Sequence, residues 1–585
     1  MLGKLGQKHQ ISFSFNTDGI SPFKHSKITI WPIYLVINEL PFAERYLTKN
    51  MILFGLWFGT EKPDMNSYLT PVVQMINEAN LFGIATKSKE FPKVYIVLLP
   101  IICDSKGKSE VMQFKAGNGY FGCTKCLHPG IHDQNKHFYP PIFESTAPQN
   151  QLRTTEHILK CLTEQSQTEN PKEIQGVQNY SVLMALLNFS MISHCVIDSM
   201  HCLWEGIVYQ FFHLWFDSSN HDKDWYIGTP IMQKLIAKKF NNIQASFDIA
   251  RHPGKFDTAI HWKAIDWKNW ILWFSIPVLQ NILPRKYFNH LVHLVQILLF
   301  FAQHKIDKRL IGKIGNQILN FYQETKVLYG VLEFKINLHS MFHMLTDIMN
   351  FGPCFTHNCF TYESMNGILL SFINGKQANI SLALHAIQLM QMLQEISIEG
   401  AHEDVKTTFN LLNKENITGD QAKNNKRTLF DNCFSVGTIA EQQLSAEIEL
   451  KIRKLFPNLI QQPTYQSFSQ IKLNNIQYYA AKVNKTKTNN SGCNFKTNNL
   501  QQFGIIESFI EIRVQTEKDR KSEFVAIINK PKSKSPVDFE HYQLFYKNSN
   551  SLIIIQIVQI CERVMIIDVD GTFIWTVSIP RKISQ

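Results

Sequence analysis

The sequence lacks an apolar run long enough to cross a membrane. Its longest uncharged apolar stretch, residues 269–284, is broken by Pro277, Gln280 and Asn281, whereas a membrane-spanning helix needs about 20 apolar residues. The first ten residues are polar and basic, and no apolar segment follows them, so we expect no secretory signal peptide. We therefore interpret residues 269–284 as a buried helix and expect no membrane partner.

Closely spaced cysteines are also scarce. The 11 cysteines are odd in number and scattered along the chain, and only Cys123 and Cys126 form a close pair. Without a secretory signal, this usage favours reduced thiols and a metal site over a framework of disulfides.

Two common catalytic motifs are missing as well. The chain has no complete phosphate-cradling loop that ends in Gly-Lys-Ser/Thr and no Gly-x-Ser-x-Gly elbow. We therefore expect no nucleotide cofactor. Lysine and arginine together number 59 against 48 aspartates and glutamates; this excess suits a polyanionic partner such as DNA, although it is also common on ordinary proteins.

The periodicity of the first hundred residues predicts a sheet. Residues 8–17, 28–40, 51–58 and 94–102 read as strands, and residues 67–83 have the apolar spacing of a helix. Asp18 follows the first strand and Asp104 follows the fourth. The order strand, strand, strand, helix, strand is that of the first half of a ribonuclease H-like fold, in which two such aspartates hold catalytic metal ions.

The whole chain, 585 residues in all, is too long for one core. We predict an α/β fold with an all-α insertion: a ribonuclease H-like core interrupted by a long helical insertion, with a small C-terminal β-barrel or sandwich domain. The expected boundaries are the first half of the core with the C-x2-C knuckle (1–145), the helical insertion (146–335), a return to the core (336–400), a helical extension (401–480), a lysine-rich linker (481–499) and the small β domain (500–585).

Three acidic residues form the first candidate site: Asp18, Asp104 and Glu363. Cleavage of a phosphodiester by two metal ions needs carboxylates that converge on the cations, and hard oxygen ligands suit Mg²⁺, or Mn²⁺ in its place. Each residue also has a simpler interpretation. Asp18-Gly19 is a common turn, Asp104 could cap a loop, and Glu363 could be a solvated glutamate that the helix dipole favours.

A second candidate site combines Cys123 and Cys126 with His339 and His343. Two thiolates and two histidines four residues apart can complete a zinc tetrahedron. The cysteines follow Asp104 by 19 and 22 residues, and the histidines precede Glu363 by 24 and 20, so a structural Zn²⁺ would clamp the two ends of the insertion. Histidines on the apolar face of a core helix are the competing interpretation, and the nearer histidines could complete the zinc site instead: His128, His132 and His137.

Three further motifs are weaker. Asp198 and His201 lie at i and i+3 near a helix start, where an N-cap aspartate with a partly buried histidine is the simplest interpretation. The segment 568–571 resembles a calcium loop but lacks the remaining ligands, so we expect it to end a hairpin. The run 530–534 could be a nuclear signal, although such runs are usually just solvated.

Several runs, taken in order, resemble the CACTA (En/Spm) transposase family and its animal and protist relatives over roughly residues 10–400. They are NTDGISPFKHSK, WPIYLVINELP, GLWFGTEKP, a Cys-Asp pair followed by NGYFGCTKC, DSMHCLWEG and NFGPCFTHNCFTYESMNG. The resemblance implies a DDE triad of Asp18, Asp104 and Glu363, and it implies that Asp198 and His201 are the family's aspartate–two–histidine motif. The related recombinase that assembles antigen-receptor genes is similar in its C-x2-C and histidine-pair zinc site.

We therefore expect a DDE transposase that cleaves DNA at transposon ends and joins the 3′-hydroxyl to target DNA. The partners of such a transposase would be double-stranded DNA and a second copy of the chain, and it would act in the nucleus. Such transposases usually carry an N-terminal DNA-binding region, whereas only a short tail precedes Asp18 here. One alternative is thus a domesticated or decayed relic that binds DNA or chromatin without cutting it. Another is a host nuclease of the ribonuclease H-like class that acts on RNA–DNA hybrids.

Overall fold

The computed structural model describes most of the chain in two compact units. One unit comprises residues 1–212 and 297–413, and the other comprises residues 213–296 and 414–584. The described residues are 9–22, 28–141, 151–168, 173–243, 249, 251–373, 381, 384, 388, 426–430, 433–457, 463–473, 476–481, 491–497, 500–515, 520–533, 542–568 and 573–578.

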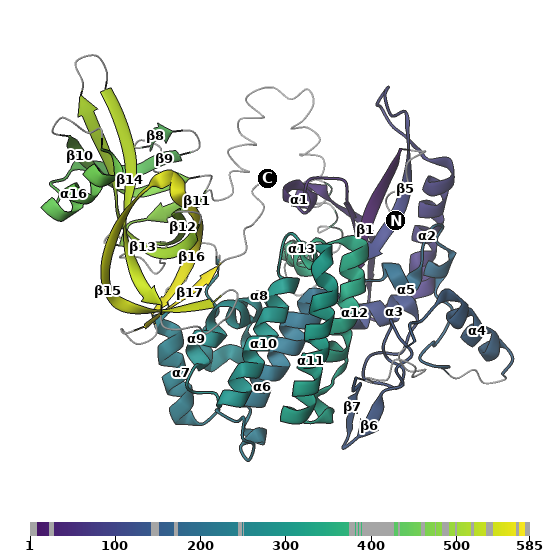
Figure 1. Cartoon of the computed structure of the whole chain (residues 1–585). Coiled ribbons are helices and arrows are strands. Elements are labelled where there is room, and N and C mark those ends of the chain that lie inside the picture. Colours follow the sequence, from purple (N-terminus) through teal and green to yellow (C-terminus); the bar gives the residue numbers. More distant parts are fainter. Residues whose placement is uncertain are drawn as a thin grey trace. The chain divides into compact units, whose positions relative to one another are not determined.

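The first unit contains a five-stranded sheet, two strands of which, β1 and β5, are labelled in Figure 1. Its strand order is β3-β2-β1-β5-β4. Strands β1, β2 and β3 pair antiparallel, whereas β5 runs parallel to β1. The four strands predicted from periodicity are confirmed, and the sequence missed only the two-residue strand β4. The bounds are β1 Gln10–Thr17, β2 Thr29–Ile37, β3 Met51–Gly59, β4 Ile84–Ala85 and β5 Lys93–Ile101.

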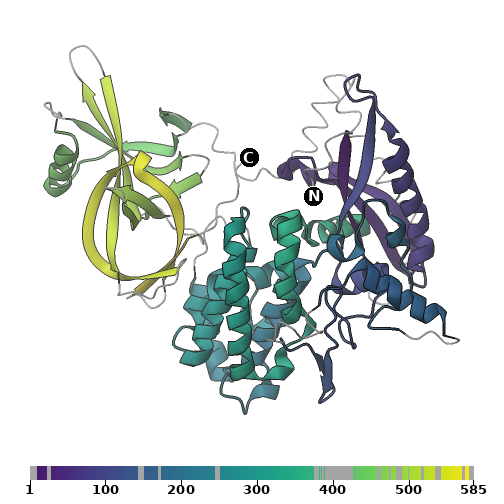
Figure 2. The same ribbon diagram turned by 45° about the vertical axis from the view of Figure 1, so that its right-hand side comes forward.

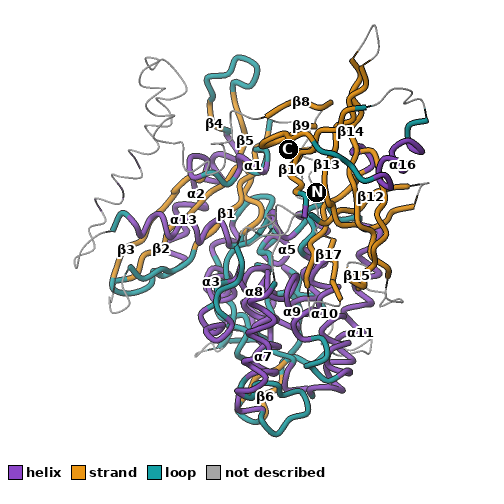
Figure 3. Tube along the Cα trace, turned by 90° about the vertical axis from the view of Figure 1, so that its left-hand side faces the viewer, coloured by secondary structure: helices purple, strands orange, loops and turns teal. Residues whose placement is uncertain are grey.

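Helices cover both faces of this sheet. Helix α2 (Met65–Phe82) buries Leu69, Val73 and Ile76 against one face, as its apolar spacing predicts, and Figure 2 shows it lying along the purple strands. Asp64 caps its first turn, and Gly83 ends it at a positive φ of 70°. Helix α13 (Phe360–Ser371) packs Leu369 on the opposite face, beside β2 and β3 (Figure 3).

A short extended segment continues the sheet beyond β5. Ile101 pairs in parallel with Cys195, and the Val196 N–H donates to the Ile101 carbonyl at 3.1 Å. The chain therefore leaves the sheet at the same edge three times: after β1, after β5 and after residues 195–197. Asp18, Asp104 and Asp198 come directly after these three exits, because parallel strands end on the same side of a sheet.

The described residues between 180 and 349 are mainly helical, as predicted. Among the described residues, no helix is both long and apolar enough for a membrane crossing. The stretch 269–284 is buried, as expected, but it is divided between α8, the π-helix η8 and α9. The main helices are α3 Ser105–Met112, α4 Thr155–Ser166, α5 Met191–His194, η5 Met200–Val208, α6 Tyr209–Phe216, α7 Pro230–Asn242, α8 Ala264–Asn269, η8 Trp270–Phe274, α9 Ser275–Leu279, α10 Arg285–Phe301, α11 Ile311–Tyr329 and α12 Ile336–Phe351; shorter ones are α1 Phe42–Arg45 and η11 Cys354–Thr356.

The C-terminal part of the second unit is a ten-stranded sheet. Six strands pair in a closed path, β12-β16-β17-β15-β14-β13, because β13 also pairs with β12. Strands β10, β9 and β8 continue from β13, and β11 pairs with β10. The bounds are β8 Lys426–Phe430, β9 Cys433–Glu441, α16 Ala446–Leu455, β10 Thr464–Leu473, β11 Ile476–Tyr479, β12 Gly492–Thr497, β13 Leu500–Gln515, β14 Arg520–Ser533, β15 Tyr542–Gln556, β16 Ile560–Asp568 and β17 Phe573–Ser578.

This sheet corrects two predicted boundaries. The predicted helical extension 401–480 is wrong over residues 426–479, where α16 is the one α-helix among the described residues and the rest is mainly strand. Tyr465, Phe468, Ile471 and Leu473 are buried along β10 between more exposed polar residues, and this mixed pattern conceals the strand. The predicted linker 481–499 contains β12, which pairs with β13 and β16. The helix expected over residues 378–416 lies almost wholly outside the described residues.

Most of the basic run 530–534 belongs to strand β14. Lys530 pairs with Ser551 of β15, and Lys532 pairs with Tyr546. A backbone that is already hydrogen-bonded in a sheet is a poor ligand for a receptor that reads extended peptides, so this run gives no support to a nuclear signal. Strand β16 ends at Asp568 and pairs antiparallel with β17, as expected for a hairpin across the segment 568–571.

Candidate functional site

Two of the predicted acidic residues lie at one edge of the sheet. β1 and β5 are hydrogen-bonded neighbours that run in parallel, and Asp18 and Asp104 follow their carboxyl ends. The first turn of α3 packs against the end of β1, since a Cβ added to Gly107 would lie 3.4 Å from the Thr17 carbonyl oxygen. The two carboxylates therefore share a rigid platform made by adjacent strands.

Asp104 is the N-cap of α3. Its Oδ1 accepts a hydrogen bond from the Gly107 N–H at 2.5 Å, which satisfies one of the free N–H groups of the helix start. A Cβ on Gly107 would lie 2.8 Å from this same oxygen, so a larger residue at that position would force the Asp104 side chain to shift. The capping interpretation of Asp104 is thus correct, and it leaves the second carboxylate oxygen available to a ligand.

Asp198 joins three segments that meet beside the sheet. The residue is buried, and its Oδ1 accepts from the N–H of Met200 at 3.2 Å and from that of Cys359 at 2.8 Å. Its Oδ2 accepts from the N–H and the Nδ1 of His201, at 2.9 and 2.7 Å. Cys359 is the N-cap of α13, so one carboxylate holds the end of segment 195–197, the start of η5 and the start of α13.

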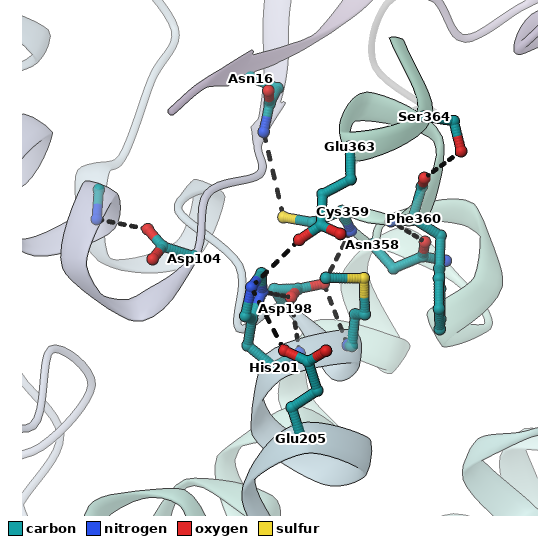
Figure 4. Close-up of polar contacts among 12 residues, drawn as sticks. Asn16, Asp104, Asp198, His201, Glu205, Asn358, Cys359, Phe360, Glu363 and Ser364 are labelled. Atoms are coloured by element: carbon teal, nitrogen blue, oxygen red, sulfur yellow. Dashed lines mark hydrogen bonds and ion pairs between the residues drawn. The ribbon is translucent and has the colours of Figure 1, made fainter. Parts of the chain in front are cut away.

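His201 continues this network to Glu363 (Figure 4). Its Nε2 lies 3.3 Å from Glu363 Oε1 and 3.9 Å from Glu205 Oε2. Both glutamates are more exposed than His201, with 47 % and 37 % of their side chains open to solvent against 29 %. His201 and Glu205 lie on the π-helix η5, a rare conformation that is frequently found at functional sites.

The electrostatics of this network favour a charged pair. Burial opposes charge on His201, but hydrogen bonds to Asp198 and Glu363 raise its pKa to about 11. Burial also opposes ionisation of Asp198, but the hydrogen bonds and the charge of His201 lower the pKa of this carboxyl below its usual value. His201 is therefore an imidazolium at neutral pH and holds the side chain of Glu363 by charge as well as by geometry.

Burial and neighbouring charges shift the pKa of Asp18. Burial, the charge of Asp104 and, to a smaller extent, the charge of Glu363 raise it to about 6, while His201 lowers it. The carboxylates of Asp104 and Glu363 thus both lie within electrostatic range of Asp18. They are not in direct contact: in Figure 4 the carboxylate of Asp104 lies apart from Glu363, which turns toward His201.

This arrangement can hold divalent cations through oxygen ligands. Among the described residues, Glu363 Oε2 has no hydrogen-bond partner, and the amide oxygen of Asn16, two residues before Asp18, is buried without one. Carboxylate and amide oxygens are the ligands that Mg²⁺ and Mn²⁺ prefer. The donor set therefore fits these cations, although Glu363 needs a change of rotamer to bind the same ion as Asp104.

The four residues of the predicted Cys–His site come together. The ligand atoms of Cys123, Cys126, His339 and His343 all lie within 4.8 Å of one another. Cys126 Sγ is 3.3 Å from His339 Nε2, which is 3.2 Å from His343 Nε2. With zinc–sulfur bonds of about 2.3 Å and zinc–nitrogen bonds of about 2.0–2.1 Å, the edges of a tetrahedron are about 3.3–3.8 Å long. The donor set and its spacing therefore fit Zn²⁺.

The thiols of this site are coupled. Burial opposes ionisation of Cys123, but a hydrogen bond from Cys126 and the imidazoles of His343 and His339 hold its pKa well below the usual value. The same bond to Cys123, together with burial, raises the pKa of Cys126. A divalent cation can bind here because metal binding displaces protons from thiolate ligands.

The nearer histidines do not join the Cys–His site. Both ring nitrogens of His128 have backbone partners: Nδ1 accepts from the Gly130 N–H, and Nε2 lies 2.8 Å from the Pro140 carbonyl oxygen. His132 and His137 face each other across the hairpin of β6 (Ile131–Asp133) and β7 (Lys136–Phe138). The distant pair on α12 therefore completes the cluster, and the alternative with local histidines is wrong.

Sequence reasoning missed several residues of these sites. Glu205 lies within the quoted run DSMHCLWEG but received no role, and only its i+4 spacing from His201 could have indicated one. Asp198, His201 and Cys359 form another group of potential metal ligands, yet hydrogen bonds account for their proximity. The buried pair Lys125–Asp347 carried no sequence signal, because its members are 222 residues apart.

Comparison with models of known protein families finds no match for this chain, and comparison with curated proteins finds none either.

Proposed function

We propose that this protein is a DDE-type transposase that cleaves DNA strands at transposon ends and transfers the freed 3′-hydroxyl ends into target DNA. The proposal combines the resemblance of the chain to the CACTA (En/Spm) family with the strand order β3-β2-β1-β5 and its antiparallel, antiparallel, parallel pairings. We interpret this sheet as a ribonuclease H-like core, and the closed path of six strands in the second unit as a small β-barrel.

One observation carries the proposal most directly. Asp18 and Asp104 follow neighbouring parallel strands, and Glu363, about 260 residues further along the chain than Asp104, returns within electrostatic range of Asp18. A carboxylate-rich edge of this kind is costly unless a cation offsets the repulsion. The pKa of Asp18 is raised mainly by burial, and the charge of Asp104 adds to the rise.

The three carboxylates would hold two Mg²⁺ or Mn²⁺ ions. Bound there, the ions would activate a water molecule or a 3′-hydroxyl for attack and stabilise the leaving oxygen. Asp18 and Asp104 would provide the fixed side of the site, because strand ends position them. Glu363 would provide the adjustable side, and His201 would keep its carboxylate ionised and oriented through the 3.3 Å contact.

The Cys–His cluster would hold a structural Zn²⁺. It joins the loop after α3 to α12, and α12 ends shortly before α13 and Glu363. All four ligands come from the protein, and such a closed site supports folding rather than catalysis. We expect the partners to be double-stranded DNA and a second copy of the chain, because both transposon ends must be held together, and we expect the protein to act in the nucleus.

Nicking of DNA by the purified chain tests this proposal. With Mg²⁺ or Mn²⁺ and a branched or terminal-repeat duplex, the wild-type chain should nick the DNA, and Asp104→Asn should reduce the rate at least about 100-fold, which is at the upper end of what loss of a supporting group costs. Asp133→Asn, on an exposed hairpin, is the matched control and should nick normally. Nicking that survives Asp104→Asn would refute the assignment.

The other outcomes separate the alternatives. Salt-dependent binding of duplex DNA without any metal-dependent nicking would indicate a transposase-derived DNA- or chromatin-binding protein. Nicking restricted to the RNA strand of an RNA–DNA hybrid would indicate a host nuclease of the same fold class.

A further inference from the structure

A buried ion pair links the Cys–His cluster to the helix that supplies its histidines. Lys125 lies between the two cysteines, and its Nζ is 2.8 Å from Asp347 Oδ1. The side chains are 8 % and 1 % exposed, and Nζ also donates to the Ile192 carbonyl at 2.9 Å. Asp347 is on α12, one helical turn after His343.

The second oxygen of Asp347 contacts the segment that leads to Asp198. Oδ2 accepts a hydrogen bond from the Ile197 N–H at 2.8 Å. Ile197 immediately precedes Asp198, which holds the Cys359 N–H at the start of α13. A continuous series of short contacts therefore runs from the knuckle through Lys125, Asp347 and Asp198 to the helix that carries Glu363.

Stability alone does not explain this pair. Removing two charges from water costs several kcal/mol per ion, and apolar residues of similar size are often as stable or more so. What an apolar pair would not provide is a carboxylate that accepts from two segments at once. The geometry thus suits a positioning role better than a purely stabilising one.

We propose that Lys125 and Asp347 are positioning residues that couple the Cys–His metal site to the acidic site. Occupation of the Cys–His site fixes Lys125, Lys125 fixes Asp347, and Asp347 fixes the segment from which Asp198 orients α13. The consequence is that metal at the Cys–His site strengthens cation binding by Asp18, Asp104 and Glu363. The identity of both metals rests on the proposed function, whereas the linkage itself rests on the contacts above.

A coupling experiment tests the proposal. A zinc-selective chelator removes the zinc, and desalting then removes the chelator. Binding of Mn²⁺ is measured by electron paramagnetic resonance before and after this treatment. Zinc removal should weaken Mn²⁺ binding by the wild-type chain about tenfold or more, as loss of a supporting shell typically does. In the double variant Lys125→Met/Asp347→Asn, which keeps an acceptor for the Ile197 N–H but removes the tie to the knuckle, the change should stay below about twofold.

The control variant lies in the second unit. Glu511 is buried and accepts two 2.8 Å hydrogen bonds from Arg427. The variant Arg427→Met/Glu511→Gln therefore removes another ion pair with a buried carboxylate and should keep the full tenfold coupling. An equal loss of Mn²⁺ affinity on zinc removal in the wild-type chain and in the Lys125→Met/Asp347→Asn variant would overturn the proposal.

Amide hydrogen exchange provides a readout that needs neither catalysis nor Mn²⁺. Zinc removal from the wild-type chain should speed exchange at Ile197 and Cys359 and leave the amides of β2 and β3 unchanged. This measurement decides the question if the double variant does not fold. Hydrogen exchange also tests the linkage if the wild-type chain binds no Mn²⁺. Absence of Mn²⁺ binding would refute the proposed function only. Unchanged exchange at both amides, or faster exchange throughout the unit, would overturn the linkage.

Discussion

The two clusters of candidate metal ligands differ in how closely their own side chains gather. In the Cys–His cluster four ligand atoms lie within 4.8 Å of one another, and both cysteines are buried. In the acidic site the carboxylates affect one another only through space, and two of them have other partners: Asp104 caps α3, and Glu363 pairs with His201.

Ligand chemistry explains this difference. Thiols and imidazoles can donate hydrogen bonds to one another, so the Cys–His side chains can lie close together without a cation. Carboxylates only repel one another, so the chain keeps them apart and stabilises each with a donor or a cation. We infer that the first cluster is prepared for a permanent ion, whereas the second closes only as its cations bind. The predictions below test that contrast, from the largest expected effect to the smallest.

Removal of a ligand from the Cys–His cluster should have the largest effect on stability. Cys126→Ser leaves three ligands and a poorer fourth, so we expect the free energy of unfolding to fall by about 4–5 kcal/mol, the range typical of losing a metal site. Chemical denaturation measures this value. Cys161→Ser, another buried thiol in the same unit, should cost about 1 kcal/mol. Equal costs for both variants would mean that Cys126 is an ordinary core residue.

Loss of His201 should affect catalysis rather than folding. His201→Gln removes the cation that holds Glu363, while the amide can still contact Asp198. We expect the nicking rate to fall about 10–100-fold and the Mg²⁺ concentration for half-maximal rate to rise, as for other residues that orient a metal ligand, with a nearly unchanged melting temperature. A normal Mg²⁺ requirement would show that His201 has no role in positioning Glu363.

Asp18→Asn should stabilise the metal-free protein at high pH. The pKa of Asp18 is raised to about 6 in the folded chain from an ordinary value of 3.8, so the folded state binds the extra proton and wild-type stability falls as pH rises from about 4 to 6. The variant should therefore be more stable at pH 8, by on the order of 2 kcal/mol, and equal to wild type near pH 4. Thermal melts in a chelating buffer at both pH values measure the difference. A wild-type chain that is the more stable one at pH 8 would contradict the account.

The sequence predicted the local elements of the sheet well because each has a clear period. The strands β1, β2, β3 and β5 and the helix α2 all lie close to their predicted positions. The pairing of β1 with β5, which brings Asp18 and Asp104 to one edge of the sheet, is not encoded in these periods. Strand β10 was missed because its buried residues do not alternate regularly.

The candidate sites were predicted in part for the same reason. Cys123, Cys126, His339 and His343 have spacings that geometry makes meaningful. The roles of Asp198 as a junction and of Lys125 with Asp347 depend on contacts across more than 140 residues. No local pattern encodes such contacts, because either partner alone looks like an ordinary charged residue.

Localised cleavage of the chain itself tests most directly whether the three acidic residues meet around cations. Fe²⁺ bound in place of Mg²⁺, with ascorbate and peroxide, generates hydroxyl radicals that cut the backbone near the ion. The account predicts cuts near residues 18, 104 and 363 in the wild-type chain, and their loss in Asp104→Asn and in excess Mg²⁺. Cuts that omit the region of residue 363, or that persist in Asp104→Asn, would contradict it.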